Sequence, residues 1–373
     1  MLESIKKKYF LIGRLVLINS HKHSNMANNV LDSPGPVRAG ERLDWQRLEK
    51  YLKERVKGLN GTLDVQQFHG GHANLTYLVR FENKEFVLRR PPFGKIAPGA
   101  HDMKREFRVL SKLNPYYDPA PKAYHYCSDE NVIGAPFVLL ERRHGIVIRR
   151  SIPDAFLGFE QIEKRVTTAM IRALSQLHLL DTSMGELSKI GRPDGYLSRQ
   201  LEGWNYRWSL VKGKNEMDIK TLFALLEKGM PQSTRVSVVH HDIKLDNCQF
   251  QPDNPDVVSS IFDWDMTTLG DPLSDFATTL SYWPDPSVAA DDLPALLTGN
   301  FPDKSFLRAL YSDLTGFDLT SLSWYESFAF LKSAIIALQL YKRYTDGETN
   351  DSRMLGFGRS AKLMTEMALQ KLL

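Results

Sequence analysis

The residues best suited to chemistry form the run His240 to Asn247 (HHDIKLDN), followed by an apolar segment that ends in Asp263. Phosphoryl transfer consists mainly of positioning the reactants and neutralising charge, so it needs one carboxylate to accept the proton of the attacking hydroxyl. Mg²⁺ prefers amide and carboxylate oxygens as ligands. The spacing therefore predicts Asp242 as the catalytic base and Asn247 and Asp263 as magnesium ligands.

Lys244 follows the predicted base by two residues. A lysine there can reach the γ-phosphate of a nucleotide as a point charge, although a single lysine on a loop is more often solvated. A structural alternative also exists: Asp242 and Asn247 would form a side-chain-to-backbone turn, and Asp263 would cap a helix. We favour the chemical interpretation, because a hairpin between the two aspartates would bring them to one cleft and the conjunction is more specific than either motif.

A glycine-containing segment, residues 70–76 (GGHANLT), lies between two predicted strands. A turn of this kind can present backbone N–H groups to phosphates, so Gly70, Gly71, Asn74 and Thr76 are candidate nucleotide-binding residues. Two glycines between strands more often form an ordinary hairpin turn, and the segment is not the G-x-G-x-x-G of protein kinases. Taken alone, the segment is therefore a weak signal.

Arg89 stands near the end of the next predicted strand, where kinases carry a lysine that contacts the α- and β-phosphates, and Glu106 on a predicted helix can pair with it. Arginine binds phosphates and carboxylates through two parallel hydrogen bonds, so the replacement is chemically reasonable. Arg90 is equally well explained as a solvated strand end. Residues 141–144 would connect the two lobes, and we expect their backbone, beginning at Glu141, to contact the adenine.

Hydrophobic periodicity indicates the elements that must position these residues. Helical spacing covers 43–56 and 103–113, strands are expected at 63–68, 75–81, 86–89 and 136–140, and the chain turns mainly helical from residue 159. The later helices are expected at 160–180, 196–210, 219–230, 273–282, 305–311, 324–344 and 359–372, and short strands at 237–240, 248–251 and 257–263 with a hairpin turn at 252–256.

These elements predict an α+β protein with a two-lobed, protein-kinase-like fold. We expect residues 36–140 to form a small β-rich N-lobe that binds the nucleotide. Residues 141–373 would form a larger, mainly helical C-lobe that carries the catalytic groups and binds the acceptor.

The N-terminal residues resemble a signal peptide only superficially. Arg14 interrupts the apolar run and no small-residue cleavage site follows it. The run is also shorter than the roughly 20 apolar residues that span a bilayer. We expect residues 1–35 to be a flexible extension, with Met26 as an alternative start.

Composition excludes several classes of protein. Hydrophobic residues make up 42% and charged residues 25% of the 373 residues, which is ordinary for a globular protein. The net charge of +4 arises within residues 1–26, so charge indicates no nucleic-acid surface. Cys127 and Cys248 occupy unrelated contexts, which argues for a reducing compartment. We expect a cytoplasmic monomer or homodimer with a small-molecule substrate and with neither nucleic acid nor a membrane as partner.

Several strings together resemble the aminoglycoside phosphotransferase and choline kinase-like family. They are GGHANLTY at 70–77, VLRRPP at 87–92, ERR at 141–143, HHD at 240–242 with Asn247, and DWD at 263–265 with GDP at 270–272. The resemblance covers about residues 30–370. Within the family, the chain is similar to the branch that contains the kinase-like domain of acyl-CoA dehydrogenase family members 10 and 11. The family usually has glycine in place of His241 and glutamate in place of Asp265, and neither change removes a required group.

The resemblance implies ATP or GTP as phosphoryl donor, Mg²⁺ as cofactor and a small-molecule hydroxyl as acceptor. In the acyl-CoA dehydrogenase-linked branch the implied acceptor is a hydroxyacyl-CoA. Aminoglycosides are polycations, whereas this chain is net neutral beyond residue 26 and carries many aromatic residues in its helical part, which argues against them.

Two further classes remain as alternatives. A nucleotide-binding pseudokinase is suggested by Arg89 and the short glycine segment. A protein kinase fits less well, because the chain lacks Asp-Phe-Gly and a recognisable Ala-Pro-Glu. The sequence specifies neither the acceptor nor the choice between ATP and GTP.

Overall fold

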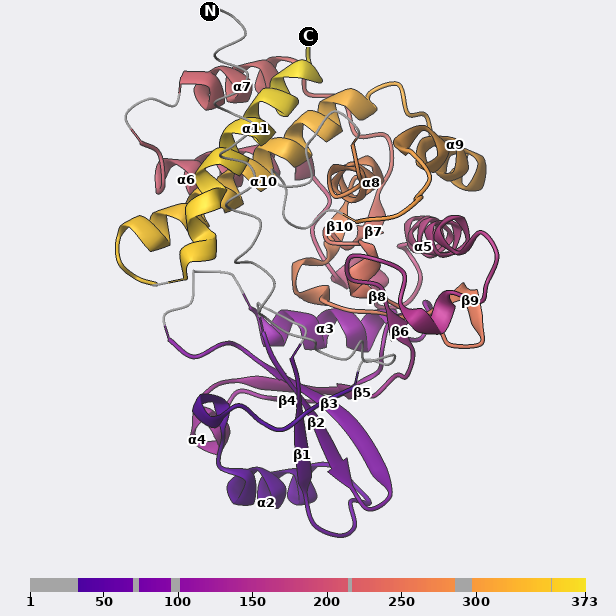
Figure 1. The fold of residues 1–373 in the computed structure, drawn as a ribbon, viewed down its shortest axis with the longest axis vertical. Helices are drawn as coiled ribbons and strands as arrows, with labels where there is room; N and C mark the ends of the chain where they lie inside the picture. Colours follow the sequence, from indigo (N-terminus) through magenta and orange to yellow (C-terminus); the bar gives the residue numbers. More distant parts are fainter. Residues whose placement is uncertain (1–32, 70–73, 95–100, 214–216, 286–296, 350) are drawn as a thin grey trace, which may run out of the picture.

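The computed structural model describes residues 33–69, 74–94, 101–213, 217–285, 297–349 and 351–373. Most of the predicted N-terminal extension, and the candidate residues Gly70 and Gly71, lie outside these ranges. A five-stranded sheet occupies one end of the molecule and most of the helices gather at the other (Figure 1). Among the described residues, no helix is long and apolar enough to cross a membrane.

The five-stranded sheet is antiparallel throughout, in the order β1-β2-β3-β5-β4. Its strands are β1 (Asp64–Phe68), β2 (Leu75–Phe81), β3 (Lys84–Arg90), β4 (Ala123–Cys127) and β5 (Phe137–Glu141). The predicted meander is present as β1 to β3, while β4 was not expected. Three helices accompany the sheet: α2 (Trp45–Arg55), α3 (Met103–Leu113) and the short α4 (Glu130–Ile133).

The two faces of the sheet bury different partners, because successive side chains of a strand point to opposite faces. On one face Phe137 and Leu139 of β5 belong to an apolar cluster that includes Leu48 and Leu52 of α2. On the other face Val138 and Leu140 join the main core, together with residues of α3. The sheet is therefore covered by α2 outside and connected through α3 to the rest of the protein.

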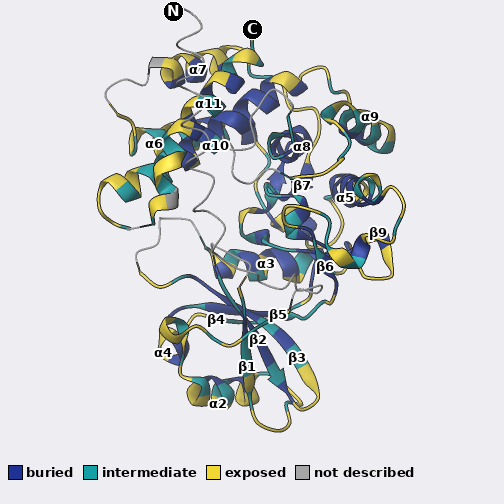
Figure 2. Cartoon of the chain, in the orientation of Figure 1, coloured by how far each residue is buried: buried dark blue, intermediate teal, exposed yellow. Residues whose placement is uncertain are grey.

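The larger part of the chain is mainly helical. Its helices are α5 (Ile162–His178), α6 (Tyr196–Ser209), α7 (Met217–Lys228), α8 (Pro272–Ser281), α9 (Lys304–Thr315), α10 (Leu322–Thr345) and α11 (Phe357–Gln370). Helix α10 packs against α8 and α11 and is buried over much of its length (Figure 2). Hydrophobic burial of this kind contributes about 25 cal/mol per Å² of apolar surface and dominates the stability of such a lobe.

Short strands and turns of 3₁₀ helix carry the motif residues between these helices. Strand β7 (Ser237–Val239) pairs with β10 (Thr268–Gly270), and β6 (Ile146–Val147), β8 (Cys248–Gln251) and β9 (Asn254–Ile261) form a three-stranded sheet. The predicted turn at 252–256 was too long, because Asn254 already pairs with Gln251 and the connection is only Pro252 and Asp253. Two 3₁₀ turns, η4 (Leu245–Asn247) and η5 (Trp264–Met266), follow the motif aspartates.

Candidate active site

One cavity of about 330 Å³ lies between the five-stranded sheet and the β8–β9 hairpin. Every predicted site residue within the described part of the chain lines it: Asn74, Thr76, Arg89, Glu106, Glu141, Asp242, Lys244, Asn247 and Asp263. These residues come from both lobes and are separated by up to 189 positions in the chain. Folding therefore brings the predicted set together around one cavity.

The predicted base, Asp242, is oriented by its neighbours in the loop after β7. Asn247 Nδ2 donates to the backbone oxygen of Asp242 at 2.8 Å and to its Oδ2 at 2.7 Å. Lys244 Nζ lies 3.2 Å from the same Oδ2, and the side chain of Tyr282 also hydrogen-bonds Asp242. Burial lowers the pKa of Lys244, but Asp242 and Asp246 more than offset this, so its pKa is raised and the lysine is a cation.

The β8–β9 hairpin fixes the separation between the predicted magnesium ligands. Cys248 of β8 pairs with Ile261 of β9, and the backbone N–H of Phe262 donates to the backbone oxygen of Asn247 at 2.9 Å. Asn247 and Asp263 therefore lie next to each other's strand at the end of the hairpin that is opposite its turn. The hairpin that the sequence predicted between them has this effect.

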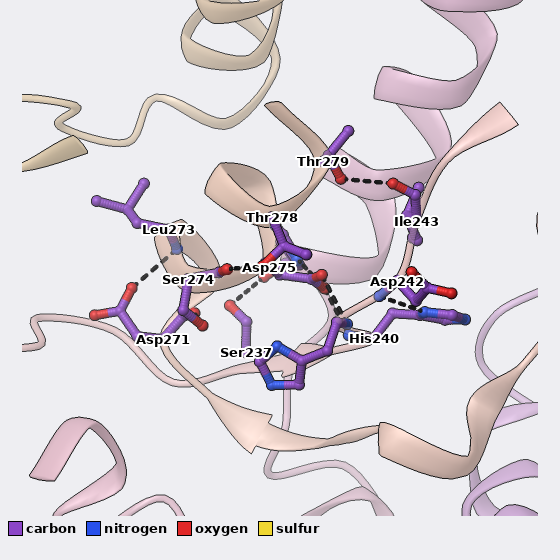
Figure 3. Close-up of polar contacts among 12 residues, drawn as sticks. Ser237, His240, Asp242, Ile243, Asp271, Leu273, Ser274, Asp275, Thr278 and Thr279 are labelled. Carbon is purple, nitrogen blue, oxygen red and sulfur yellow. Dashed lines mark hydrogen bonds and ion pairs between the residues drawn. The ribbon is translucent and has the colours of Figure 1, made fainter. Parts of the chain in front are cut away.

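Asp275 on α8 holds the start of the loop that carries Asp242. Its carboxylate accepts a hydrogen bond from the backbone N–H of His240 at 2.5 Å (Figure 3). It also accepts one from the backbone N–H of His241 at 2.8 Å and lies 3.1 Å from Nε2 of His178. Burial alone would raise the pKa of Asp275, but the hydrogen bond from His178 and the nearby histidines hold it well below its usual range.

Two non-glycine residues at the site adopt the left-handed backbone conformation. The φ angle is 75° at His241 and 70° at Asp263. Side chains other than glycine adopt this region rarely, and the strain costs about 1–3 kcal/mol per residue. This geometry explains physically why glycine is the usual residue of the resembling family at the position of His241. It also places strain directly beside the predicted base and at a predicted metal ligand.

Arg89 connects the sheet to both α3 and the loop after β9. Its guanidinium contacts Oε1 of Glu106, and its Nη2 lies 2.6 Å from Oδ1 of Asp263. Burial alone would raise the pKa of Asp263, but Arg89 lowers it below its usual value, so Asp263 is a carboxylate. Burial raises the pKa of Glu106 to about 7, against the opposing effect of Arg89. The predicted pairing of Arg89 with Glu106 is present.

The donor set fits Mg²⁺. Both hydrogens of the Asn247 amide are donated to Asp242, which leaves its Oδ1 as an acceptor. Burial and the nearby Asp263 raise the pKa of Asp265 to about 6, a sign of crowded carboxylates that a divalent cation would relieve. Among the described residues, no three His, Cys, Asp or Glu side chains form a metal cage. Mg²⁺ needs none, because it is commonly held by one or two carboxylates together with substrate phosphates and water.

The opposite end of the cavity is formed by the segment after β5. The Glu141 carboxylate accepts from the backbone N–H of Lys122 at 3.0 Å and pairs with Nε of Arg143 at 3.0 Å. The Arg142 guanidinium lies over the Phe68 ring, 4.8 Å from its centroid. Since the Glu141 side chain already has protein partners, contact with a base would involve the backbone, as the sequence suggested.

Sequence reasoning missed several residues at this site. Tyr282 and Arg149 were not singled out, although Tyr282 contacts the predicted base and Arg149 lines the cavity. Nor was Arg105, which donates to the backbone oxygens of Met266 and Thr267. A tyrosine at the end of a helix or an arginine on a helix has no local signature, because its partner is distant in the chain.

Curated relatives match most of this chain. Acyl-CoA dehydrogenase family member 10 of Mus musculus is 30% identical over 345 residues, which covers 89% of this chain and 31% of that protein. Acyl-CoA dehydrogenase family member 11 of Homo sapiens is 28% identical over 346 residues, covering 88% of this chain and 43% of that protein. The chain therefore spans less than half the length of these relatives.

Solved structures share the fold. A Ralstonia eutropha protein named for the aminoglycoside phosphotransferases is 29% identical, with a TM-score of 0.74, and the match covers 89% of this chain and 98% of that one. The choline kinase of Cryptosporidium parvum is 14% identical with a TM-score of 0.58, covering 88% of this chain and 95% of that one. The predicted two-lobed kinase-like fold is thus confirmed. The model of the phosphotransferase enzyme family matches residues 64–310, and the chain belongs to that family.

Proposed function

We propose that this chain transfers the γ-phosphoryl group of ATP to a hydroxyl of a small molecule, with Mg²⁺ as cofactor. The observation that carries the proposal is the position of Asp242, Asn247 and Asp263 around one cavity that Arg89 and Lys244 also line. A carboxylate base, two oxygen ligands for magnesium and two cations are the groups that phosphoryl transfer requires. GTP is the alternative donor.

The proposed reaction balances as follows. The acceptor oxygen forms a bond to the γ-phosphorus while the bond from that phosphorus to the β–γ bridging oxygen breaks, and ADP leaves. Asp242, which Asn247 and Lys244 hold in place, accepts the proton of the acceptor hydroxyl. Mg²⁺, when bound, neutralises charge on the phosphates, and Asn247 and Asp263 would hold it. Asn74, whose buried Nδ2 has no partner among the described residues, and Thr76 are proposed to contact the phosphates.

Replacement of the base tests this proposal. In Asp242→Asn we expect ADP release with ATP, Mg²⁺ and a hydroxylated acceptor to fall by about 10²–10⁴-fold, the usual contribution of a general base. Asp263→Asn should also lower activity and raise the Mg²⁺ concentration that the reaction requires, because a carboxylate ligand is lost. Asp253→Asn, on the exposed tip of the β8–β9 hairpin, is the matched control. Normal turnover in a folded Asp242→Asn protein would contradict the proposal.

The acceptor is proposed to be a hydroxyacyl-CoA. The support is the likeness over most of this chain to proteins named as acyl-CoA dehydrogenase family members. We further propose that residues 36–140 serve as the nucleotide-binding lobe and residues 141–373 as the catalytic and acceptor-binding lobe, preceded by an extension over residues 1–35. A cytoplasmic monomer or homodimer remains the proposed state. A panel of hydroxyacyl-CoAs, aminoglycosides and amino alcohols, followed by ADP release, separates the candidate acceptors.

A nucleotide-binding pseudokinase is the second candidate, and one observation favours it. Arg89 Nη2 lies 2.6 Å from Oδ1 of Asp263, so the predicted metal ligand already has a cationic partner. If that pair persisted with nucleotide bound, Asp263 would hold Mg²⁺ less well. Detectable Mg²⁺-dependent turnover of any hydroxylated acceptor would exclude this candidate.

A further inference from the structure

A buried lysine lies on the side of the catalytic loop that faces α8 and α10. Lys332 of α10 is only 9% exposed, in a helix whose neighbouring residues are mostly apolar. Its Nζ donates to Oγ1 of Thr278 on α8 at 3.0 Å and lies 5.5 Å from the centre of the Phe328 ring. Within the described part of the chain, these contacts are with a hydroxyl and an aromatic ring rather than with a carboxylate. Buried lysines without a paired acid are rare, because desolvation of the ammonium is costly.

Lys332 belongs to the electrostatic surroundings of the predicted base. Burial lowers the pKa of Lys332 to about 8, and the charges of Asp275 and Asp242 oppose this shift. Thr278 Oγ1 donates its own hydrogen to the backbone oxygen of Ser274 and therefore accepts from Lys332. Counting only residues that the structure describes, this uses one of the three N–H groups of the lysine and leaves two for other partners.

His241, the residue before the base, has a matching unused group. The Ser274 hydroxyl donates to the backbone oxygen of Asp271 at 2.7 Å, so the Tyr196 hydroxyl, 2.9 Å from Ser274 Oγ, donates to Ser274. The hydrogen of Tyr196 is then committed, and Nε2 of His241, 2.8 Å from the Tyr196 oxygen, must carry the proton. In a neutral ring Nδ1 is therefore a bare acceptor.

That acceptor is buried and has no hydrogen-bond partner among the described residues. Burial, and after it the charge of Lys332, lowers the pKa of His241 to about 3, so the ring is neutral at physiological pH. A chain of hydrogen bonds through Thr278 and Ser274 of α8 and through Tyr196 connects Lys332 to His241, the residue next to Asp242. A buried polar group left unpaired costs about 1–3 kcal/mol, so the unpaired nitrogen of His241 beside the proposed base, with spare donors on Lys332, is consistent with a site completed by a ligand.

We propose that Lys332 and Nδ1 of His241 form a subsite that selects the acceptor. Lys332 donates to an oxygen of the acceptor other than the one that is phosphorylated, and where that oxygen is a hydroxyl it also donates to His241. An acceptor with an ammonium group is rejected by the charge of Lys332. The proposal rests on the proposed function and narrows its substrate class to hydroxyl compounds that carry a second neutral or anionic oxygen group.

Four acceptors with the same three-carbon chain test the proposed selection of acceptor: 3-hydroxypropanoate, 1,3-propanediol, 1-propanol and 3-amino-1-propanol. For the unmodified protein we expect kcat/KM to be highest for the first two and lowest for the amino alcohol. Lys332→Met should reduce the advantage of the first two over 1-propanol by about tenfold to a hundredfold, as expected for loss of a hydrogen bond from a charged donor. KM for ATP should not change.

His241→Gly distinguishes an acceptor whose second oxygen group is a hydroxyl from one in which it is a carboxylate. Glycine adopts the local φ of 75° without strain, so the variant should fold. It should weaken only 1,3-propanediol, because the carboxylate uses Lys332 alone. Lys342→Met, an exposed position on the same helix, is the control for Lys332→Met. An unchanged preference in Lys332→Met, or a preference of the unmodified protein for the amino alcohol, would overturn the proposal.

Two measurements do not depend on turnover. Nitrogen-15 NMR of His241, assigned with His241→Gly, should show a proton on Nε2 and a bare Nδ1; a proton on Nδ1 would overturn the subsite. Saturation-transfer NMR with the same four compounds, in the presence of a non-hydrolysable ATP analogue, measures binding directly. If the unmodified protein binds the four compounds in the expected order of affinity but does not turn them over, the phosphotransferase function is refuted and the subsite is retained. If the unmodified protein binds none of them, the subsite is refuted.

Discussion

Arg89 and Asp263 form an ion pair between the two lobes, with 2.6 Å between Nη2 and Oδ1, although 174 residues separate them in the chain. The same guanidinium contacts Glu106 on α3. A lysine has a single nitrogen and cannot make both contacts in one planar fork. Arginine at this position therefore links β3 and α3 directly to the predicted metal ligand.

Replacement of Arg89 should affect the nucleotide and the metal together. In Arg89→Met we expect kcat/KM for ATP to fall by at least about a hundredfold, since hydrogen bonds between charged groups contribute about 1.5–3 kcal/mol each. Arg89→Lys should recover part of this loss. Steady-state kinetics over a range of Mg²⁺ concentrations provides the measurement. Arg80→Met, at a partly exposed position on β2, is the control, and equal losses in both variants would contradict the prediction.

Arg105 should position the loop that follows Asp263. Its guanidinium donates to the backbone oxygens of Met266 at 3.2 Å and Thr267 at 3.1 Å, which ties α3 to η5. In Arg105→Met we expect faster amide exchange over residues 264–268 and about a tenfold higher Mg²⁺ requirement, as for loss of a hydrogen bond from a charged group. Arg108→Met, an exposed residue of the same helix, should show neither change. Unaltered exchange in Arg105→Met would disprove the role.

Asp275 should make stability depend on pH. Its folded pKa lies below the unfolded value of about 3.9, so its contribution to the free energy of unfolding is present above about pH 4 and is lost as the pH falls towards the folded pKa. Asp275→Ala leaves two backbone N–H groups unpaired and should cost about 3 kcal/mol or more near pH 7. Urea unfolding near pH 7 and near pH 3 should show a smaller difference between wild type and variant at the lower pH. A difference that does not change with pH would refute the argument.

Two glycines provide a matched test of packing. A Cβ at Gly270 would lie 2.6 Å from the Tyr196 ring, whereas a Cβ at Gly203 on α6 would meet nothing within 4 Å. Gly270→Ala should therefore destabilise the protein by about 1–3 kcal/mol through overpacking. Gly203→Ala should stabilise it by about 0.5–1 kcal/mol through helix propensity. Thermal unfolding of both variants measures the effect, and a neutral Gly270→Ala would show that Tyr196 can move.

The sequence indicated the parts of the site whose residues are close in the chain. The run from His240 to Asn247 places a base, a lysine and an amide within one loop, and hydrophobic alternation located β2 and most of β3. Helix α3 was predicted with its observed ends, Met103 and Leu113. Local spacing suffices for such elements, because their residue types and periodicity act over a few positions.

Other features depend on contacts that no local pattern contains. Strand β4 escaped prediction because its five residues include two tyrosines and a histidine that are partly exposed, so no apolar run marks it. The hydrogen bonds from His240 and His241 to Asp275 span 35 and 34 positions. Lys332 does have a local signal in the sequence: it is the single cation in the mostly apolar stretch from Phe328 to Ala337 of a helix. A charge in such a stretch is either paired or functional.

The β8–β9 hairpin has a consequence for protein engineering. The pairing of Cys248 with Ile261 and the hydrogen bond between Asn247 and Phe262 fix its base, while Pro252 and Asp253 at its tip are exposed. Residues added at the tip would extend into solvent and leave the two ends in register. A short reporter peptide could therefore be inserted between Pro252 and Asp253, ten residues from Asp263, with the positions of Asn247 and Asp263 retained.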